Sequence, residues 1–136
     1  MGKHLDINYF KKRLKVRSKV AKKRSVINKI KAWELGKEYY DGSRLNGYGG
    51  FKYDGRWLKL LPKLIKKYKL TSKSKVLDLG CKKGFLLKDL NILLPGIKSF
   101  GVENHSYPLK NSVKCNSKLI ECEYYNLPFK NKYFDF

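Results

Sequence analysis

The chain has 136 residues, of which 42% are hydrophobic, so it is long enough to bury a core of its own. Its net charge of +21 favours phosphates, nucleic acid or anionic lipid surfaces as partners, although lysines spread over a surface often serve only to solvate it. No apolar run approaches the roughly 20 residues of a membrane span. The cysteines form no CxxC pair, which is typical of reduced thiols in a cytoplasmic protein, and we expect no metal site.

Residues 1–37 form a basic segment in which Ile7, Phe10 and Leu14 recur at helical spacing. This pattern predicts a basic helical N-terminal segment. Such a segment either contacts nucleic acid or an anionic membrane, or packs as a solvated helix along the domain. No aromatic residue is interleaved among residues 11–31 to stack on bases, which favours the packed helix over nucleic-acid binding.

Residues 38–70 begin with a stretch that is rich in glycines and aromatic residues. One interpretation is a lid over a ligand pocket, with Tyr48 in its wall and Arg44 or Arg56 pairing with a carboxylate. The other is a packed loop whose arginines pair with Asp41 or Asp54. Both stay open.

Apolar residues between Trp57 and Tyr68 then follow a helical rhythm. Pro62 interrupts this rhythm, so it either kinks the helix or marks its start. The apolar stripe predicts a helix that covers one face of the sheet that follows.

Residues 71–136 alternate apolar runs of strand length with amphipathic stretches of helical length. The expected strands and helices are Lys75–Asp78, Phe85–Leu93, Lys98–Glu103, Ser106–Val113, Lys118–Glu123 and the opening of a fourth strand at Tyr133–Phe136. This alternation predicts an α/β fold with a Rossmann-like parallel sheet and flanking helices.

Three successive predicted strands end in an acid, at Asp78, Glu103 and Glu123. Ligands of open parallel sheets bind at these carboxyl ends, so the three acids and the turn between Gly80 and Gly84 should surround one crevice. An acid near the position of Glu103 commonly binds ribose hydroxyls, which suggests a nucleoside. A carboxylate at Asp78 would repel a pyrophosphate but attract the ammonium and sulfonium of S-adenosylmethionine.

These residues resemble the class I S-adenosylmethionine-dependent methyltransferases. Val76–Phe85 is similar to their first motif, Gly101–Glu103 to the motif of their second strand, and Glu123–Phe129 with Tyr133–Asp135 to the stretch around the adenine. The resemblance covers Lys75–Phe136 in the same order and spacing. It departs from the family at Lys82, where a glycine is usual, and at Glu123, where the usual acid is Asp.

The resemblance implies roles for the first strand and its turn. Asp78 would orient the methionine ammonium, directly or through water. Gly80, Cys81 and Gly84 would bring bare backbone close to the methionine and adenosine parts of the cofactor. The alternative for Asp78 is a helix-capping acid.

The resemblance also implies roles for the next two strand ends. Glu103 would bind both ribose hydroxyls, and Asn104 would flank the adenine. Glu123 and the amide of Tyr124 would face the adenine edge. The alternative for each glutamate is an ion pair with a nearby lysine.

The implied activity is methyl transfer from S-adenosylmethionine to an unidentified acceptor, more plausibly a small metabolite or a sugar or lipid precursor than RNA. The sequence identifies no catalytic base. We expect these residues to be the amino-terminal part of a longer enzyme, inactive alone, because the family's sheet continues beyond the fourth strand. Two alternatives are a nicotinamide-dependent (NAD) oxidoreductase and a basic nucleic-acid-binding module without catalysis.

Overall fold

The computed structural model describes residues 19–136 of the chain. It divides between Lys52 and Tyr53 into two compact units, which we call the N-terminal unit and the C-terminal unit. The division falls inside the predicted stretch 38–70, so the glycine- and aromatic-rich residues are shared between the two units. Residues 1–18 of the predicted basic helical segment 1–37 lie outside the described residues.

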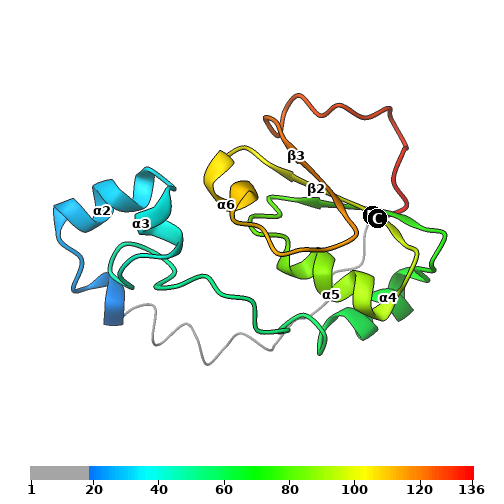
Figure 1. The fold of residues 1–136 in the computed structure, drawn as a ribbon, viewed down its shortest axis with the longest axis horizontal. Coiled ribbons are helices and arrows are strands. Elements are labelled where there is room, and N and C mark those ends of the chain that lie inside the picture. Colours follow the sequence, from blue (N-terminus) through cyan, green and yellow to red (C-terminus); the bar gives the residue numbers. More distant parts are fainter. Residues whose placement is uncertain (1–18) are drawn as a thin grey trace. The chain divides into compact units, whose positions relative to one another are not determined.

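The N-terminal unit contains helices α2 (Val26–Trp33) and α3 (Lys37–Tyr40), followed by a long loop (Figure 1). Helix α2 begins at Ser25, whose hydroxyl accepts a hydrogen bond from the Asn28 N–H at 3.3 Å. The Asn28 side chain accepts one in return from the Ser25 N–H at 3.0 Å. This reciprocal cap satisfies two backbone donors that the first helical turn would otherwise leave unpaired.

Aromatic side chains hold the loop of the N-terminal unit. The ring of Tyr48 lies 5.7 Å from that of Tyr40 and 4.3 Å from that of Phe51, centroid to centroid. Tyr40 is fully buried among them. The amide of Phe51 also donates to the Tyr40 carbonyl at 2.9 Å. Within its own unit, this stretch is therefore a packed loop, which is one of the two interpretations of its sequence.

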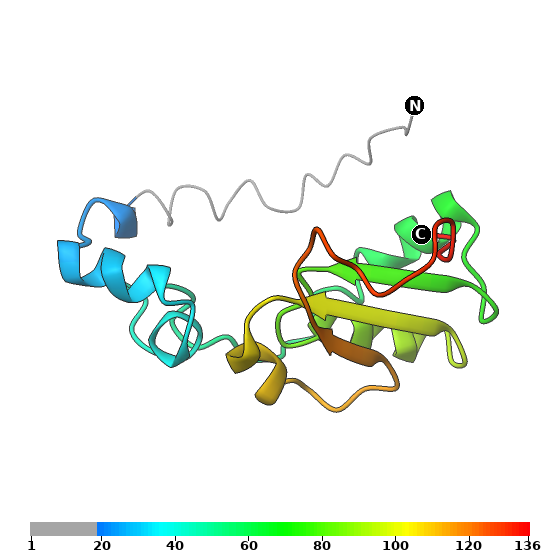
Figure 2. The ribbon, with the colours of Figure 1, turned by 90° about the horizontal axis from the view of Figure 1, so that it is seen from above.

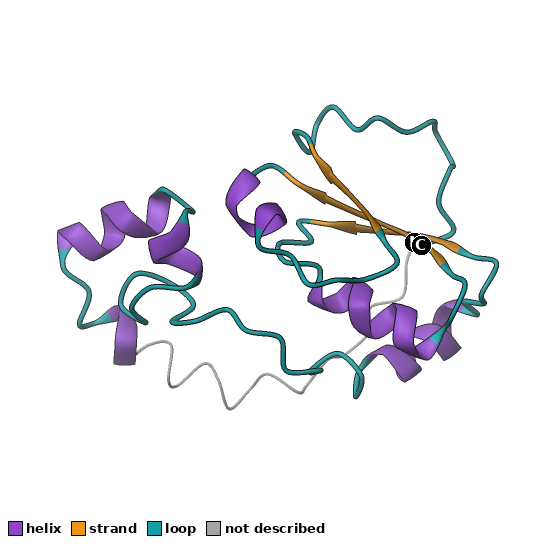
Figure 3. Cartoon of the chain, in the orientation of Figure 1, coloured by secondary structure: helices purple, strands orange, loops and turns teal. Residues whose placement is uncertain are grey.

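The C-terminal unit is a three-stranded parallel sheet in the order β1-β2-β3, with flanking helices (Figures 1 and 3). Its elements are α4 (Leu61–Tyr68), β1 (Lys75–Leu79), α5 (Phe85–Leu93), β2 (Lys98–Glu103), α6 (Ser106–Lys110) and β3 (Lys118–Glu121). The predicted parallel sheet is confirmed. Helix α5 and strand β2 have the predicted bounds, and β1 extends one residue beyond the predicted Asp78, to Leu79. Pro62 lies in the first turn of α4, where its missing N–H leaves no hydrogen bond unmade.

Helices α4 and α5 cover one face of the sheet, and the C-terminal segment crosses the other (Figures 1 and 2). On the helical face, Val76 of β1 is buried in a cluster with four other apolar side chains: Leu61, Leu70, Leu90 and Ile97. On the opposite face, the ring of Phe100 from β2 packs edge-on against Phe129 and Phe134. Apolar side chains therefore pack on both faces of the sheet.

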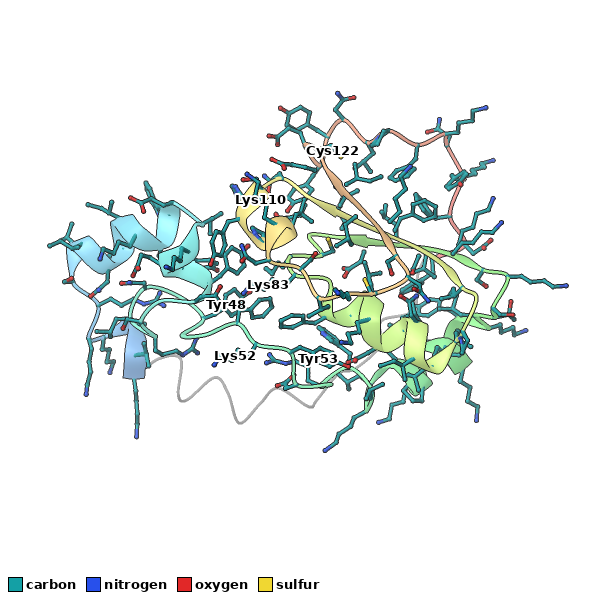
Figure 4. All side chains as sticks on the ribbon, in the orientation of Figure 1. Tyr48, Lys52, Tyr53, Lys83, Lys110 and Cys122 are labelled. Atoms are coloured by element: carbon teal, nitrogen blue, oxygen red, sulfur yellow. The ribbon has the colours of Figure 1, made fainter. Side chains whose placement is uncertain are left out.

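A buried carboxylate fixes the start of the C-terminal unit to α5. Asp89 is 0% exposed and accepts hydrogen bonds from the Tyr53 hydroxyl at 2.5 Å and the Trp57 N–H at 3.0 Å. The hydrogen bond to Asp89 raises the pKa of Tyr53 to about 12. Tyr53, labelled in Figure 4, also packs edge-on against Phe85. Asp89 thus ties residues 53–57 onto the helix.

Two predicted elements are shorter in the structure. The third strand ends at Glu121 instead of Glu123, because the chain turns away, with the Asn126 N–H donating to the Glu123 carbonyl at 3.1 Å. The helix after β2 ends at Lys110 instead of Val113. There the Val113 N–H donates to the Lys83 carbonyl at 3.0 Å, a contact that draws the chain out of the helix.

Residues 133–136 do not form the predicted regular strand, yet they lie along the free edge of β1. The Leu77 N–H donates to the Phe136 carbonyl at 2.8 Å, and the Phe136 N–H lies 3.4 Å from the Lys75 carbonyl. This is the hydrogen-bond pattern of a parallel pair. The chain therefore adds β2 and β3 on one side of β1 and returns to its other side, so the strand order reverses at β1.

Candidate functional site

Asp78 and Glu103 lie on one face of the sheet at the carboxyl ends of neighbouring strands. Asp78 of β1 is paired in register with Gly101 of β2, and Glu103 follows two residues later. Because side chains alternate along a strand, both carboxylates point to the face that carries α5. They lie next to the point where the strand order reverses, which is where open parallel sheets bind ligands.

The turn after β1 folds back onto β2. The amides of Gly80 and Cys81 donate to the Val102 carbonyl at 2.8 and 3.0 Å. Gly80 and Gly84 have φ values of 79° and 75°, which glycine adopts without strain. Lys82 also has a positive φ of 54°. A residue with a side chain adopts this conformation at a cost of about 1 kcal/mol.

Gly101 lets the turn approach β2 closely. A Cβ atom at this position would lie 2.6 Å from the Cys81 Sγ and 2.7 Å from the Leu87 Cδ1. Real Cβ atoms do not come so near to other atoms. The bare backbone at Gly101 is therefore needed for the turn and α5 to sit against the sheet.

Glu103 is 2% exposed, and three donors satisfy its carboxylate. The Lys82 N–H donates to Oε2 at 3.1 Å, and the Asn104 N–H donates to Oε1 at 3.0 Å. The Tyr124 hydroxyl donates to Oε1 at 2.8 Å. A buried ionised carboxylate is stable only with such partners, so Glu103 connects the turn, the end of β2 and the loop after β3.

Burial and neighbouring acids perturb the ionisation of this group of residues. Burial raises the pKa of Asp78 to about 6, with a further rise from Glu103 and an opposing effect of Lys82. Burial also raises the pKa of the Cys81 thiol to about 12, helped by both carboxylates. The pKa of Tyr124 rises to about 12 through burial and its hydrogen bond to Glu103. Perturbed acids at the end of a sheet are a frequent mark of a binding site.

The structure brings some of the predicted cofactor residues together. Gly80, Cys81 and Gly84 form the turn beside Asp78 and Glu103. The backbone N–H of Asn104 donates to the carboxylate of Glu103, the preceding residue. Tyr124 joins them through its hydroxyl, whereas the sequence had suggested a role only for its amide.

Glu123 is a predicted cofactor residue that lies just beyond the end of β3, next to Tyr124. It is exposed, and it follows Cys122 beyond the end of β3 (Figure 4). The register partner of Glu103 on β3 is Glu121, so the predicted strand end was two residues too late. No hydrogen bond joins the Glu123 side chain to Asp78 or Glu103 among the residues that the structure describes.

The two arginines of the expected lid bind groups that are close to them in the sequence. Arg44 donates from Nη1 to the carbonyls of Gly47 and Tyr48 at 2.7 and 3.1 Å. Arg56 pairs through Nε with Asp54 at 2.7 Å, as the packed-loop interpretation expected. Tyr48 lies in the aromatic cluster of the N-terminal unit (Figure 4). A lid over a ligand stays a prediction.

Two functional contacts escaped prediction from the sequence. The Tyr124 hydroxyl and the Lys82 amide each reach Glu103 across 21 residues, and no local pattern signals such contacts. Asp89 carried a signal, because it follows the apolar Phe85 by four residues and so lies on the same face of α5.

Within residues 19–136, no three acidic, cysteine or histidine side chains gather in a way that could hold a metal ion. In the same part of the chain, every helix is too short or too polar to cross a membrane. Comparisons with models of protein families, with curated proteins and with solved structures found no match to this chain. The function therefore has to be argued from the site itself.

Proposed function

We propose that the C-terminal unit binds S-adenosylmethionine and that the protein is a methyltransferase of the class I type. The observation that carries the proposal is the pair of carboxylates, Asp78 and Glu103, on one face of the sheet beside a glycine turn. One acid would suit the cationic methionine end of the cofactor and the other would suit its ribose diol. The reversal of strand order at β1 supports the same location for the ligand.

The backbone amides of the turn favour a cofactor without phosphate. A pyrophosphate at such a turn needs free N–H donors. The amides of Gly80 and Cys81 are bound to the Val102 carbonyl, and the Lys82 amide is bound to Glu103. The amide of Gly84 donates to the Cys81 carbonyl at 2.9 Å. With these donors engaged and two carboxylates nearby, a nicotinamide dinucleotide fits this turn poorly.

Tyr124 supports the assignment of Glu103 to a ribose hydroxyl. The phenol donates an O–H to the Glu103 carboxylate, as a sugar hydroxyl would, and it is 37% exposed. Its oxygen lies 3.7 Å from the position of a Cβ on Gly80, so it stands against the turn. Rotation of this side chain would make the carboxylate available without leaving it unpaired, because the ribose would replace the phenol.

S-adenosylmethionine supplies a methyl group on a positively charged sulfur. The sulfur–methyl bond breaks, a bond to a nucleophilic oxygen, nitrogen or carbon forms, and the acceptor gives up a proton. The residues described above would hold the donor: Asp78 the ammonium, Glu103 the ribose, and Gly80 the close backbone approach. Such catalysis depends chiefly on holding donor and acceptor in line at short distance.

Calorimetric titration with S-adenosylhomocysteine tests the proposal. We expect saturable binding at neutral pH that Asp78→Asn weakens by about tenfold or more, because the ammonium loses its carboxylate. Glu34→Gln is the matched control, since it removes one exposed carboxylate from the N-terminal unit. Binding of nicotinamide dinucleotide instead of S-adenosylhomocysteine would reverse the proposal, and so would equal binding by the two variants.

A further inference from the structure

The N-terminal unit contains a hollow of about 340 Å³ that the proposed methyltransferase site does not use. The residues that line it come from positions 20–24, from α3 and from the loop after α3: Val20, Ala21, Arg24, Tyr39, Arg44, Gly47 and Tyr48. Among these residues two are arginines and none is an acid. A hollow of this size is within the range of small-molecule sites.

Arg24 has an unusual position in this hollow. Its Nε is buried and has no hydrogen-bond partner among the residues that the structure describes. A buried guanidinium donor that lacks an acceptor is unfavourable, because its lost hydration is not replaced by a hydrogen bond. An acceptor that enters the hollow would remove this penalty.

Arg44 is held in place on the same hollow. Its Nη1 donates to two carbonyls of its own loop, Gly47 at 2.7 Å and Tyr48 at 3.1 Å. These bonds fix the guanidinium group without neutralising its charge. Neither Arg44 nor Arg24 forms an ion pair with a carboxylate in residues 19–136. The hollow therefore offers two arginine charges to a ligand.

We propose that this hollow binds the phosphate group of a small phosphorylated molecule. A phosphate monoester carries two negative charges and several acceptor oxygens, so it matches two guanidinium groups better than a ligand with a single carboxylate would. The volume leaves room for a further part of the ligand beside Tyr39 and Tyr48, whose rings are 5.3 Å apart and packed edge-on. The ligand class is thus a compact phosphorylated metabolite rather than phosphate alone.

The proposal is independent of the cofactor assignment, because S-adenosylmethionine carries no phosphate. Ribose 5-phosphate is the probe, with ribose as the phosphate-free control, titrated into the full 136-residue chain. Arginine Nε–Hε resonances are followed by NMR, and the Arg24 signal is assigned from its loss in Arg24→Lys. We expect this signal to move on addition of ribose 5-phosphate and to stay in place on addition of ribose.

Variants separate a built site from general attraction to a basic protein. Arg24→Gln should weaken ribose 5-phosphate binding by about tenfold or more, and Arg24→Lys, which keeps the charge but loses the planar fork, by less. Lys23→Gln removes the same charge from an exposed neighbour outside the hollow, so it should change the affinity by about twofold or less. If Arg24→Gln does not fold, the affinity of Arg24→Lys is compared with that of Lys23→Gln, and the proposal expects the Arg24→Lys variant to bind more weakly.

Three results would overturn the proposal. The first is the absence of any movement of the Arg24 signal with ribose 5-phosphate. The second is equal weakening by the Arg24 and Lys23 variants, which would mean nonspecific attraction only. The third is binding of an oligouridylate that depends on Arg24 while ribose 5-phosphate does not bind, which would assign the arginines to an RNA surface.

Discussion

Two neighbouring carboxylates of the C-terminal unit, Asp78 and Glu103, differ in their burial and in their hydrogen bonds. Glu103 is buried with three hydrogen-bond donors, and the structure satisfies it completely. Asp78 lies half-buried beside it, and burial together with Glu103 raises its pKa to about 6. The first acid therefore helps to hold the turn in place, whereas the second is unfavourable in its ionised form until a cation arrives. This difference is what the proposed binding of a cationic ligand would use.

The raised pKa of Asp78 predicts how the stability of the protein depends on pH. The folded state holds this proton more tightly than the unfolded state, whose pKa is near the ordinary value of 3.8. The free energy of unfolding should therefore fall as the pH rises from about 4 to about 6, by about 2 kcal/mol. Asp78→Asn should be more stable than the original protein above pH about 6 and equally stable below pH about 4, as measured by urea unfolding.

The binding of S-adenosylhomocysteine should show the opposite sign. The ionised carboxylate attracts the ammonium, so the affinity of the original protein should fall as the pH drops through about 6. Asp78→Asn should bind weakly and with little pH dependence over the same range. A variant that is both less stable and unchanged in affinity would contradict this account of Asp78.

The turn after β1 and strand β2 act as one packed element. The turn amides bond to the Val102 carbonyl, and the turn side chain of Cys81 lies over Gly101. The same bare position also accommodates Leu87 of α5 and Leu119 of β3. The geometry of the candidate site therefore depends on close packing at Gly101 as much as on the turn sequence.

Gly101→Ala should lower the free energy of unfolding by about 1–3 kcal/mol, because the added methyl group would overlap the Cys81 sulfur and two leucine side chains. Urea unfolding followed by circular dichroism measures the change. Gly36→Ala is the matched control, since the nearest atom to an added Cβ there is 3.9 Å away. Equal effects of the two substitutions would show that the packing at Gly101 is not tight.

The hydrogen bonds of Asp89 should hold the segment before α4 against α5. Asp89→Asn replaces one acceptor oxygen with a donor, so it cannot accept from both Tyr53 and Trp57. Residues 53–57 should then detach, and trypsin should cleave after Lys52, Arg56 and Lys59 faster than in the original chain. Asp54→Asn removes the exposed ion pair with Arg56 in the same segment and keeps an acceptor oxygen for the Arg56 N–H, so it should change cleavage little. Equal protection in both variants would mean that Asp89 does not hold the segment.

The whole molecule combines two compact units with a net charge of +21. The candidate cofactor site belongs to the C-terminal unit, and the hollow with two arginines belongs to the N-terminal unit. The charge acts on every anionic partner at long range, whereas each site acts through contacts. Measurements at several salt concentrations separate these two contributions.

Salt should weaken the binding of polyanions far more than that of the cofactor. A protein with this charge should bind heparin or RNA at low ionic strength. The affinity should fall steeply with added salt, because the release of counterions from the polyanion then becomes less favourable. S-adenosylhomocysteine carries balanced charges, so its affinity should change by about twofold or less over the same range. Fluorescence anisotropy and calorimetry measure the two series. RNA affinity that resists salt would instead favour a specific nucleic-acid-binding protein.

Local sequence patterns were sufficient to predict the elements around the candidate site. The apolar run Lys75–Leu79, the glycines at 80 and 84 and the apolar period of Phe85–Leu93 depend on neighbouring residues, so strand, turn and helix followed from local rules. The parallel order and the position of Asp78 and Glu103 at adjacent strand ends followed from the same alternation.

The contacts that these residues make with distant parts of the chain are visible only in the folded protein. Glu103 receives two of its three donors from residues 21 positions away, one on either side, and Phe136 pairs with β1 from the far end of the chain. The early end of β3 and the unpartnered Nε of Arg24 likewise depend on how the chain turns and packs. Hydrogen bonds and burial between distant residues leave no periodic trace in the sequence, and for this reason the structure was needed to find them.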